Sequence, residues 1–209
     1  MSPRCRFSGR VSGIVALVAS LTATPAVAQP IIRVPQFVVH AVKLQVLDET
    51  GWFDWTGSDE VHAVFVDFNA NKERATSVYG ETDTGDTVEF RDQDRCIAPL
   101  PDCNRGARSL NFAIALWEKD WTPAEGLLGC KPGLVNGHPW YDDGICPGDD
   151  LIGRAQISLS QLQLTGTLPT VGHTVERMVP LTGGDGHYQF HYRITRLPDI
   201  ERRIIIREP

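Results

Sequence analysis

The sequence lacks any run of basic residues. Its 20 Lys and Arg residues are outnumbered by 26 Asp and Glu residues. Nucleic-acid binding draws most of its affinity from cationic side chains on phosphates, so this balance argues against a nucleic-acid partner. It argues equally against binding an anionic surface through charge alone. The acidic composition is typical of a protein that binds cations.

The short motifs of common hydrolases and nucleotide-binding enzymes are also missing. The chain has no Gly-x-Ser-x-Gly, no His-Glu-x-x-His and no phosphate-binding loop. His187 and His191 are four apart in a predicted strand, hence on one face, but no carboxylate motif accompanies them. Paired loop carboxylates leave a glycoside hydrolase as the alternative. We expect a binding module rather than an enzyme.

Long stretches of helical period, internal repeats and low-complexity tracts are absent too. Alternation of period two instead predicts eight strands separated by Gly, Pro, Asn and Asp. The predicted strands cover residues 37–47, 61–68, 76–79, 87–90, 110–117, 151–159, 175–181 and 187–197. The one helical piece is a short turn near 158–164. This pattern predicts an all-β fold, an antiparallel β-sandwich or barrel.

The N-terminus resembles an export signal. Residues 1–28 combine three arginines, a short apolar run over 11–21 and the small-x-small site Ala26-Val27-Ala28. We expect cleavage near Ala28 and a periplasmic or secreted protein, the alternative being an uncleaved anchor. Residues 29–209 then form a single domain. This part keeps 17 basic and 26 acidic residues, a net charge of about −9.

Cysteine is scarce, and four cysteines remain after the leader: Cys96, Cys103, Cys130 and Cys146. An even number in an exported protein predicts two disulfides. Three pairings are possible, and we expect neighbours to pair, Cys96 with Cys103 and Cys130 with Cys146. The second bridge would brace the long irregular loop over 120–150. A zinc site is the alternative, but the spacing is not Cys-x-x-Cys and no His follows at finger-like spacing.

Acidic residues gather at the ends of predicted strands. Asp54 and Asp59 lie in the first loop, Glu118 and Asp120 follow the fifth strand, and Asp150 begins the sixth. If successive strands run antiparallel, these strand ends share one edge of the sheet. Carboxylates about 4 Å apart repel by about 1 to 4 kcal/mol per pair, so such a cluster favours a hard cation. Calcium, which takes six to eight oxygen ligands in flexible geometry, is the expected cofactor.

An EF-hand does not explain the first loop. With Asp48 as position one, Phe53 stands where that motif requires Gly.

The order of the acidic motifs resembles the C2 domain, an eight-stranded β-sandwich of many calcium-dependent lipid-binding proteins. Asp54 and Ser58-Asp59 match its first loop, and Glu118-Lys119-Asp120 matches an Asp-x-Asp pair with Glu in first place. Asp150-Leu151-Ile152-Gly153 matches an Asp followed by two apolar residues and Gly. The resemblance implies five calcium ligands: Asp54, Asp59, Glu118, Asp120 and Asp150. It also suggests the permuted topology, in which the last strand takes the place of an N-terminal one.

Apart from Glu118, the chain departs from the C2 pattern in two further places. Glu60-Val61 stands where Pro-Tyr usually follows Ser-Asp, and the third loop is much longer than usual.

Aromatic residues accompany the acids in both loops: Trp52, Phe53, Trp55, Trp121 and Trp140. In lipid-binding C2 domains, apolar residues at these loop tips enter the membrane while calcium bridges to lipid phosphate. Trp suits that boundary because its body is apolar and its tip polar. The alternatives are that these aromatics pack on one another or recognise a sugar.

The expected function is therefore an exported calcium-binding sandwich whose loops engage a surface ligand such as phospholipid. The alternative is a structural or protein-interaction sandwich in which calcium is absent or only stabilising.

Overall fold

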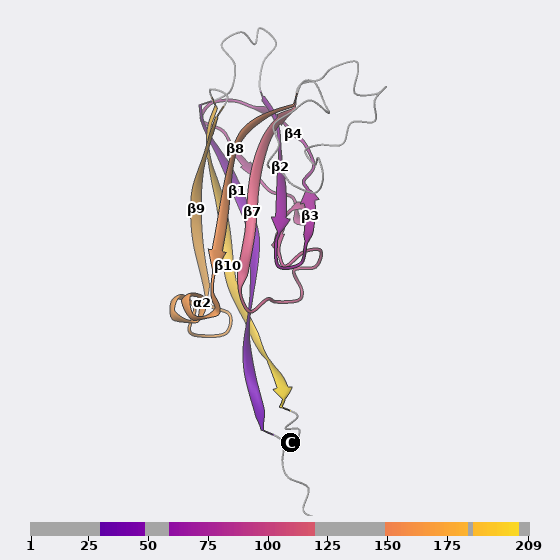
Figure 1. Cartoon of the computed structure of the whole chain (residues 1–209). Coiled ribbons are helices and arrows are strands. Elements are labelled where there is room, and N and C mark those ends of the chain that lie inside the picture. The colour runs from indigo at the N-terminus through magenta and orange to yellow at the C-terminus, as the bar shows by residue number, and fades with distance from the viewer. Residues whose placement is uncertain (1–29, 49–58, 120–148, 184–185, 205–209) are drawn as a thin grey trace, which may run out of the picture.

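Two antiparallel sheets packed face to face form the body of the protein (Figure 1). The computed structural model describes residues 30–48, 59–119, 149–183 and 186–204. Within those residues, no helix is long and apolar enough to cross a membrane. The predicted fold class, an all-β antiparallel sandwich, is confirmed.

The first sheet is built around the two longest strands. Its order is β5-β1-β10-β9, and β6 also pairs with β1. The pairing of β1 with β10 runs from Ile31 opposite Arg203 to Asp48 opposite His187, so the last strand lies beside the first, as the permuted topology predicts. The strands of this sheet are β1 (Ile31–Asp48), β5 (Thr87–Glu89), β6 (Cys96–Ala98), β9 (Thr174–Gly183) and β10 (Gly186–Arg203).

The second sheet has the order β3-β2-β7-β8, and β4 also pairs with β2. Among the described residues, two short helices lie outside the sheets: the 3-10 helix η1 (Asp92–Asp94) and the α-helix α2 (Gln161–Thr167). The strands of the second sheet are β2 (Asp59–Asp67), β3 (Lys72–Ala75), β4 (Tyr79–Thr82), β7 (Leu110–Lys119) and β8 (Asp149–Leu159).

The core lies between the sheets because apolar residues alternate along each strand. Phe65 of β2 meets Phe190 of β10 edge-on, with ring centroids 5.9 Å apart. Phe90 joins them, 5.1 Å from Phe190. A second buried cluster covers the opposite face of the second sheet, and its members are Val64, Val66, Ala113, Ala115 and Trp117. That sheet is therefore apolar on both faces, which explains why strand 110–117 has a nearly continuous apolar sequence.

The predicted strand at 76–79 is wrong. The backbone N–H of Ala63 donates to Oγ1 of Thr76 at 3.0 Å, so a side chain takes the place of a backbone acceptor. This interrupts the ladder, and two short strands, β3 and β4, flank residues 76–78. With β6 also missed, the eight predicted strands correspond to ten in the described part of the chain.

The predicted helical turn is displaced by a few residues. Ser160 caps α2: its Oγ accepts from the N–H of Gln163 at 3.3 Å, and Oε1 of Gln163 accepts from the N–H of Ser160 at 2.8 Å. This capping box fixes the start of the helix at Gln161.

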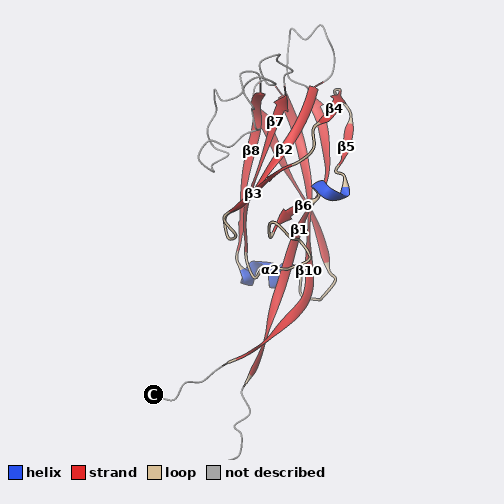
Figure 2. Ribbon diagram, turned by 90° about the vertical axis from the view of Figure 1, so that its right-hand side faces the viewer, coloured by secondary structure: helices blue, strands red, loops and turns tan. Residues whose placement is uncertain are grey.

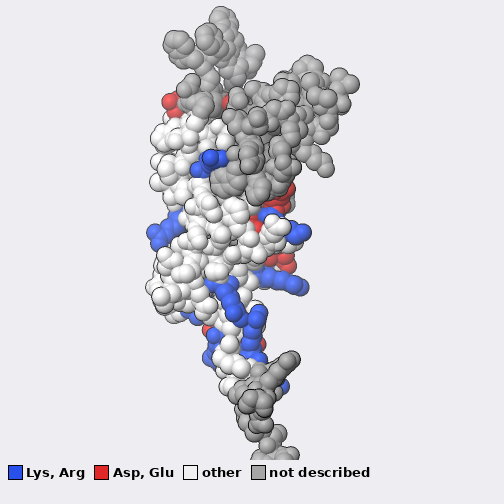
Figure 3. All heavy atoms as spheres, viewed as in Figure 1, with Lys and Arg blue, Asp and Glu red and all other residues white. Residues whose placement is uncertain are grey.

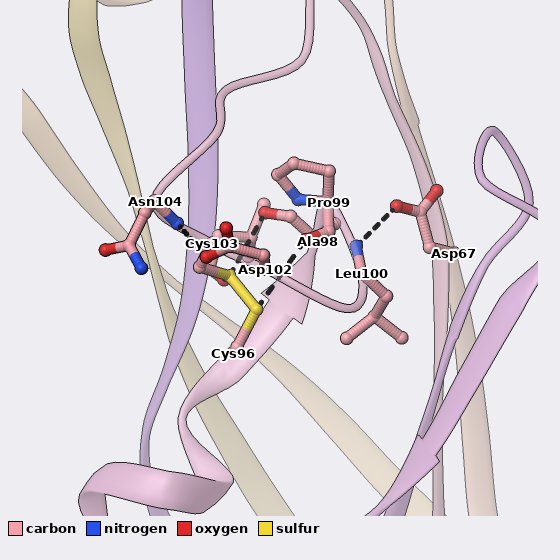
Figure 4. The surroundings of a disulfide bond; sticks show 9 residues. Asp67, Cys96, Ala98, Pro99, Leu100, Asp102, Cys103 and Asn104 are labelled. Carbon is pink, nitrogen blue, oxygen red and sulfur yellow. Dashed lines mark hydrogen bonds between the residues drawn. A yellow bond between two sulfur atoms is a disulfide. The ribbon is translucent and has the colours of Figure 1, made fainter.

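A disulfide joins Cys96 and Cys103, with Cα atoms 5.6 Å apart, which confirms the predicted pairing (Figure 4). Cys130 and Cys146 lie outside the described residues. Next to the bridge, the buried carboxylate of Asp67 accepts from the N–H of Leu100 at 2.9 Å. Its other oxygen accepts from the N–H groups of Asn69 and Ala70, at 2.9 and 3.1 Å. Asp67 therefore ties the β2–β3 turn to the segment that follows β6.

Candidate functional site

Four strand ends that carry acidic residues lie at one end of the sandwich. β1 ends at Asp48, β2 begins at Asp59, β7 ends at Lys119 and β8 begins at Asp149. Both views place these ends together and α2 at the opposite end (Figures 1 and 2). The ends of β2, β7 and β8 share one edge of the second sheet, as the sequence predicts, whereas the end of β1 belongs to the first sheet and lies at the same end of the sandwich. We call this the acidic end.

The strand register brings three of the five predicted calcium ligands to adjacent strands. Glu118 lies directly opposite Asp150 in the β7–β8 pair. Glu118 also lies opposite Val61, two residues along β2 from Asp59. Opposed residues in an antiparallel pair share a face of the sheet, and Val61 belongs to the core between the sheets. Glu118, which is half-buried, therefore stands at the rim of the space between the two sheets.

The remaining predicted site residues lie outside the described residues: Asp54, Asp120, Trp52, Phe53, Trp55, Trp121 and Trp140. In the part of the chain that is described, no group of three or more His, Cys, Asp or Glu is placed to hold a metal ion. Calcium ligation by the five residues therefore stays a prediction.

An acidic turn that the sequence analysis missed lies at the same end. Gly85 donates its N–H to the carbonyl of Val46 at 2.9 Å, and Val46 donates to the carbonyl of Asp86 at 3.0 Å. These bonds hold the β4–β5 turn, with the exposed Asp83 and Asp86, against the last residues of β1. Gly85 has φ of +97°, a conformation that favours glycine. The Asp-Thr-Gly-Asp sequence marks a turn, but only the fold shows which strand the turn meets.

Charge is unevenly distributed along the molecule. On the face shown in Figure 3, acidic side chains are visible at the acidic end and about halfway along the molecule, and Lys and Arg are most prominent toward the other end. There β1 and β10 continue as a two-stranded ribbon beyond the body of the sandwich (Figure 2). The exposed Arg33, Arg202 and Arg203 belong to this ribbon.

Gly153 explains why glycine follows the two apolar residues after Asp150. A Cβ atom at this position would lie 2.6 Å from the N atom of Thr182 and 2.9 Å from the carbonyl carbon of Leu181. Both are backbone atoms of β9, so glycine is what allows β8 and β9 to approach where the two sheets meet. This close contact positions β8, the strand that carries Asp150, against β9.

A polar groove of about 510 Å³ lies on the outer face of the first sheet. His40, Arg95 and Arg193 line it. The pKa of His40 is lowered by burial first, and then by the positive charges of Arg193 and Arg95. His40 is therefore a neutral side chain at pH 7.

His191 has a carboxylate neighbour that the sequence does not reveal. Its Nε2 lies 2.8 Å from Oε1 of Gln45, and its Nδ1 lies 3.5 Å from Oε1 of Glu176 on β9. Arg193 holds the other oxygen of Glu176 at 3.5 Å. No sequence motif indicates this contact, because Glu176 comes from the adjacent strand.

We expect acid to destabilise the protein through His40. Because the pKa of His40 is lower in the folded protein, the unfolded chain binds more protons below about pH 6.5, so stability falls as the pH drops. Denaturant unfolding at pH 7.5 and 5.5 should show a smaller acid loss for His40→Gln than for wild type. His173→Gln, at an exposed site, is the control and should keep the wild-type loss. Equal losses in wild type and His40→Gln would refute this role.

Comparison with known proteins yields structural matches only. No family model matches the chain, and no curated protein matches it. Human GIVD cytosolic phospholipase A2 in complex with methyl gamma-linolenyl fluorophosphonate and terbium chloride matches at 7% identity with a TM-score of 0.39. The match covers 81% of this chain but 18% of that one. The same phospholipase without terbium chloride matches at 6% identity with a TM-score of 0.39, covering 82% and 19%.

A single domain also matches over most of its length. This domain, the C2 domain designated A of plant extended synaptotagmin 1, is 10% identical with a TM-score of 0.37. The match covers 80% of this chain and 97% of that one. At these values the matches carry no argument about function. The fold is described by its own strand order: an all-β sandwich of two antiparallel sheets with the last strand beside the first.

Proposed function

We propose that the protein is an exported, non-catalytic module that binds calcium at its acidic end and engages a phospholipid surface through the adjoining loops. The observation that carries the proposal is the register of three strands. It sets Glu118 opposite Asp150 and brings Asp59 to the neighbouring strand.

Electrostatics supports a cation at this place. Like charges directly opposite each other in a sheet are destabilising. Asp83 and Asp86 add further negative charge at the same end. Calcium offsets this repulsion. It takes six to eight oxygen ligands, more than the carboxylates of these strands supply, so some coordination positions remain for lipid phosphate.

The net charge of the chain explains why calcium would also control binding to the membrane. A domain with a charge of about −9 is repelled by anionic headgroups at low ionic strength. Calcium at the acidic end would reverse the local sign and place the loop aromatics Trp52 and Trp55 against the membrane interface.

Vesicle cosedimentation tests the proposal. We expect wild-type protein to sediment with phosphatidylserine-containing vesicles in calcium and to remain in the supernatant in EDTA. The double variant Trp52→Ala and Trp55→Ala should lose most of the bound fraction, because two interfacial anchors are removed. The control is Leu162→Ala, which removes an exposed apolar residue at the opposite end and should sediment like wild type. Binding that is equal in calcium and EDTA, or unchanged in the double variant, would contradict the membrane proposal.

The second candidate function is a protein-interaction sandwich in which calcium is absent or only stabilising. The β1–β10 ribbon favours it, because Ile31, Ile32 and Ile200 are 55%, 42% and 46% exposed there. In that case the same vesicle assay would show no sedimentation in either condition.

A further inference from the structure

A second candidate binding site lies at the end opposite the acidic loops. A pocket of about 320 Å³ opens between α2 and strands β9 and β10. This volume is at the low end of the range for small-molecule sites, and five of the nine lining residues are apolar. The apolar residues of the wall are Leu159, Leu164, Leu168, Val175 and Ile194.

The helix that forms one wall is fixed at both ends. At its start, the capping box of Ser160 and Gln163 holds the first turn. At its end, the guanidinium of Arg196 donates to the carbonyls of Leu168, at 3.1 Å, and of Pro169. Leu164 and Leu168 are 2% and 0% exposed, so the helix is also anchored in the core. The pocket is therefore part of the packed fold.

Four polar side chains line the same pocket: Gln163 and Thr167 of α2, Arg177 of β9 and Tyr192 of β10. Tyr192 is buried and packs edge-on against Phe112, with ring centroids 5.7 Å apart. Burial raises the pKa of Tyr192, so its hydroxyl stays protonated at neutral pH, although the positive charge of Arg177 opposes the shift. The hydroxyl of Tyr192 and the guanidinium of Arg177 are both hydrogen-bond donors.

Neither donor is occupied by a protein acceptor among the described residues. Within those residues, Arg177 makes no ion pair and the hydroxyl of Tyr192 makes no hydrogen bond. Glu176, the nearest acid in sequence, is engaged by His191 and Arg193 on the other face of the sheet. The pocket thus combines a partly apolar wall with an exposed guanidinium that makes no ion pair among the described residues.

We propose that this pocket binds a free single-chain amphiphile with an anionic oxygen headgroup, of the class of medium-chain fatty carboxylates. The chain lies against Leu159 and Val175, the partly exposed apolar residues of the wall, and the carboxylate accepts from Arg177 and Tyr192. A guanidinium matches a carboxylate in charge and in geometry. The small volume selects a single chain over a two-chain phospholipid.

Calorimetric titration with decanoate, below its micelle concentration, tests the proposal on the mature chain. EDTA is present throughout, so the result does not depend on the calcium site. We expect saturable binding of one decanoate per chain, and binding about tenfold weaker in Arg177→Met. Tyr192→Phe should weaken binding several-fold. Arg108→Met removes an exposed arginine elsewhere and should bind like wild type.

Two further ligands separate the contributions of head and tail. Acetate, which has the headgroup without the chain, should not bind measurably, and decyltrimethylammonium, which has the chain with a positive head, should bind at least about tenfold more weakly than decanoate. Thermal unfolding of each variant confirms that it is folded. Three results would overturn the proposal: no saturable decanoate binding by wild type, equal affinity for the cationic amphiphile, or wild-type affinity in folded Arg177→Met.

Discussion

Asp67→Ala is expected to lower the free energy of unfolding by about 3–5 kcal/mol, since hydrogen bonds to a charged group contribute about 1.5–3 kcal/mol each and are not additive. Asp67 is 2% exposed, and its carboxylate accepts three backbone N–H groups, from Leu100, Asn69 and Ala70. Alanine leaves those N–H groups without their acceptor. A buried N–H that has no hydrogen-bond partner destabilises the folded state, because in the unfolded chain the same group is hydrogen-bonded to water. Denaturant unfolding at neutral pH measures the loss.

A matched control distinguishes the loss of a buried hydrogen-bond acceptor from the loss of an exposed one. The exposed Asp102 accepts one backbone N–H, from Asn104 at 2.9 Å, and lies in the surroundings of the same disulfide (Figure 4). Asp102→Ala should cost less than about 1 kcal/mol, because water replaces the lost acceptor. If Asp67→Ala costs no more than Asp102→Ala, then Asp67 does not tie the two segments together as described.

Gly153→Ala is expected to destabilise the protein by about 1–3 kcal/mol or more, the usual cost of overpacking. The added Cβ would meet backbone atoms of Thr182 and Leu181 at 2.6 and 2.9 Å, and backbone cannot rotate away as a side chain can. The strain falls on β8 three residues from Asp150, so we also expect weaker calcium binding. Thermal unfolding and a calcium titration of the same variant measure the two effects.

Gly166→Ala is the control, with an expected effect of opposite sign. Gly166 lies in α2, and nothing is within 4 Å of the position a Cβ would take. Alanine there should stabilise the protein by about 0.5–1 kcal/mol, because glycine is the poorer helix former. Equal stability of Gly153→Ala and wild type would mean that β8 and β9 are further apart than described.

Local sequence patterns predicted those parts of the fold that depend on neighbouring residues. Period-two alternation located most of the strands, and the short spacing of Cys96 and Cys103 indicated their pairing. Alternation did not separate β3 from β4. The break between them arises because the hydroxyl of Thr76 replaces a backbone acceptor, and a single side-chain hydrogen bond leaves no periodic signal in the sequence. β6 consists of three apolar residues that are all buried, so it shows no alternation.

The candidate site was predictable where motif and strand end coincide. Glu118 and Asp150 flank strongly apolar segments, so their meeting followed from an antiparallel order. Asp83 and Asp86 were missed because their place beside β1 depends on the path of β4 and β5. The contact of Glu176 with His191 and the pocket under α2 were missed for the same reason: each joins residues that only the folded sheet brings together.

The central claim is calcium at the acidic end, and unfolding with calcium or EDTA tests it most directly. Ligand linkage predicts that calcium at a hundredfold excess over its dissociation constant stabilises wild type by about 2.7 kcal/mol. Glu118→Gln, which keeps the shape of the side chain and removes its charge, should lose most of that gain. Glu73→Gln, at an exposed position of β3, should retain it. An unfolding curve of wild type that is identical in millimolar calcium and in EDTA would contradict the claim.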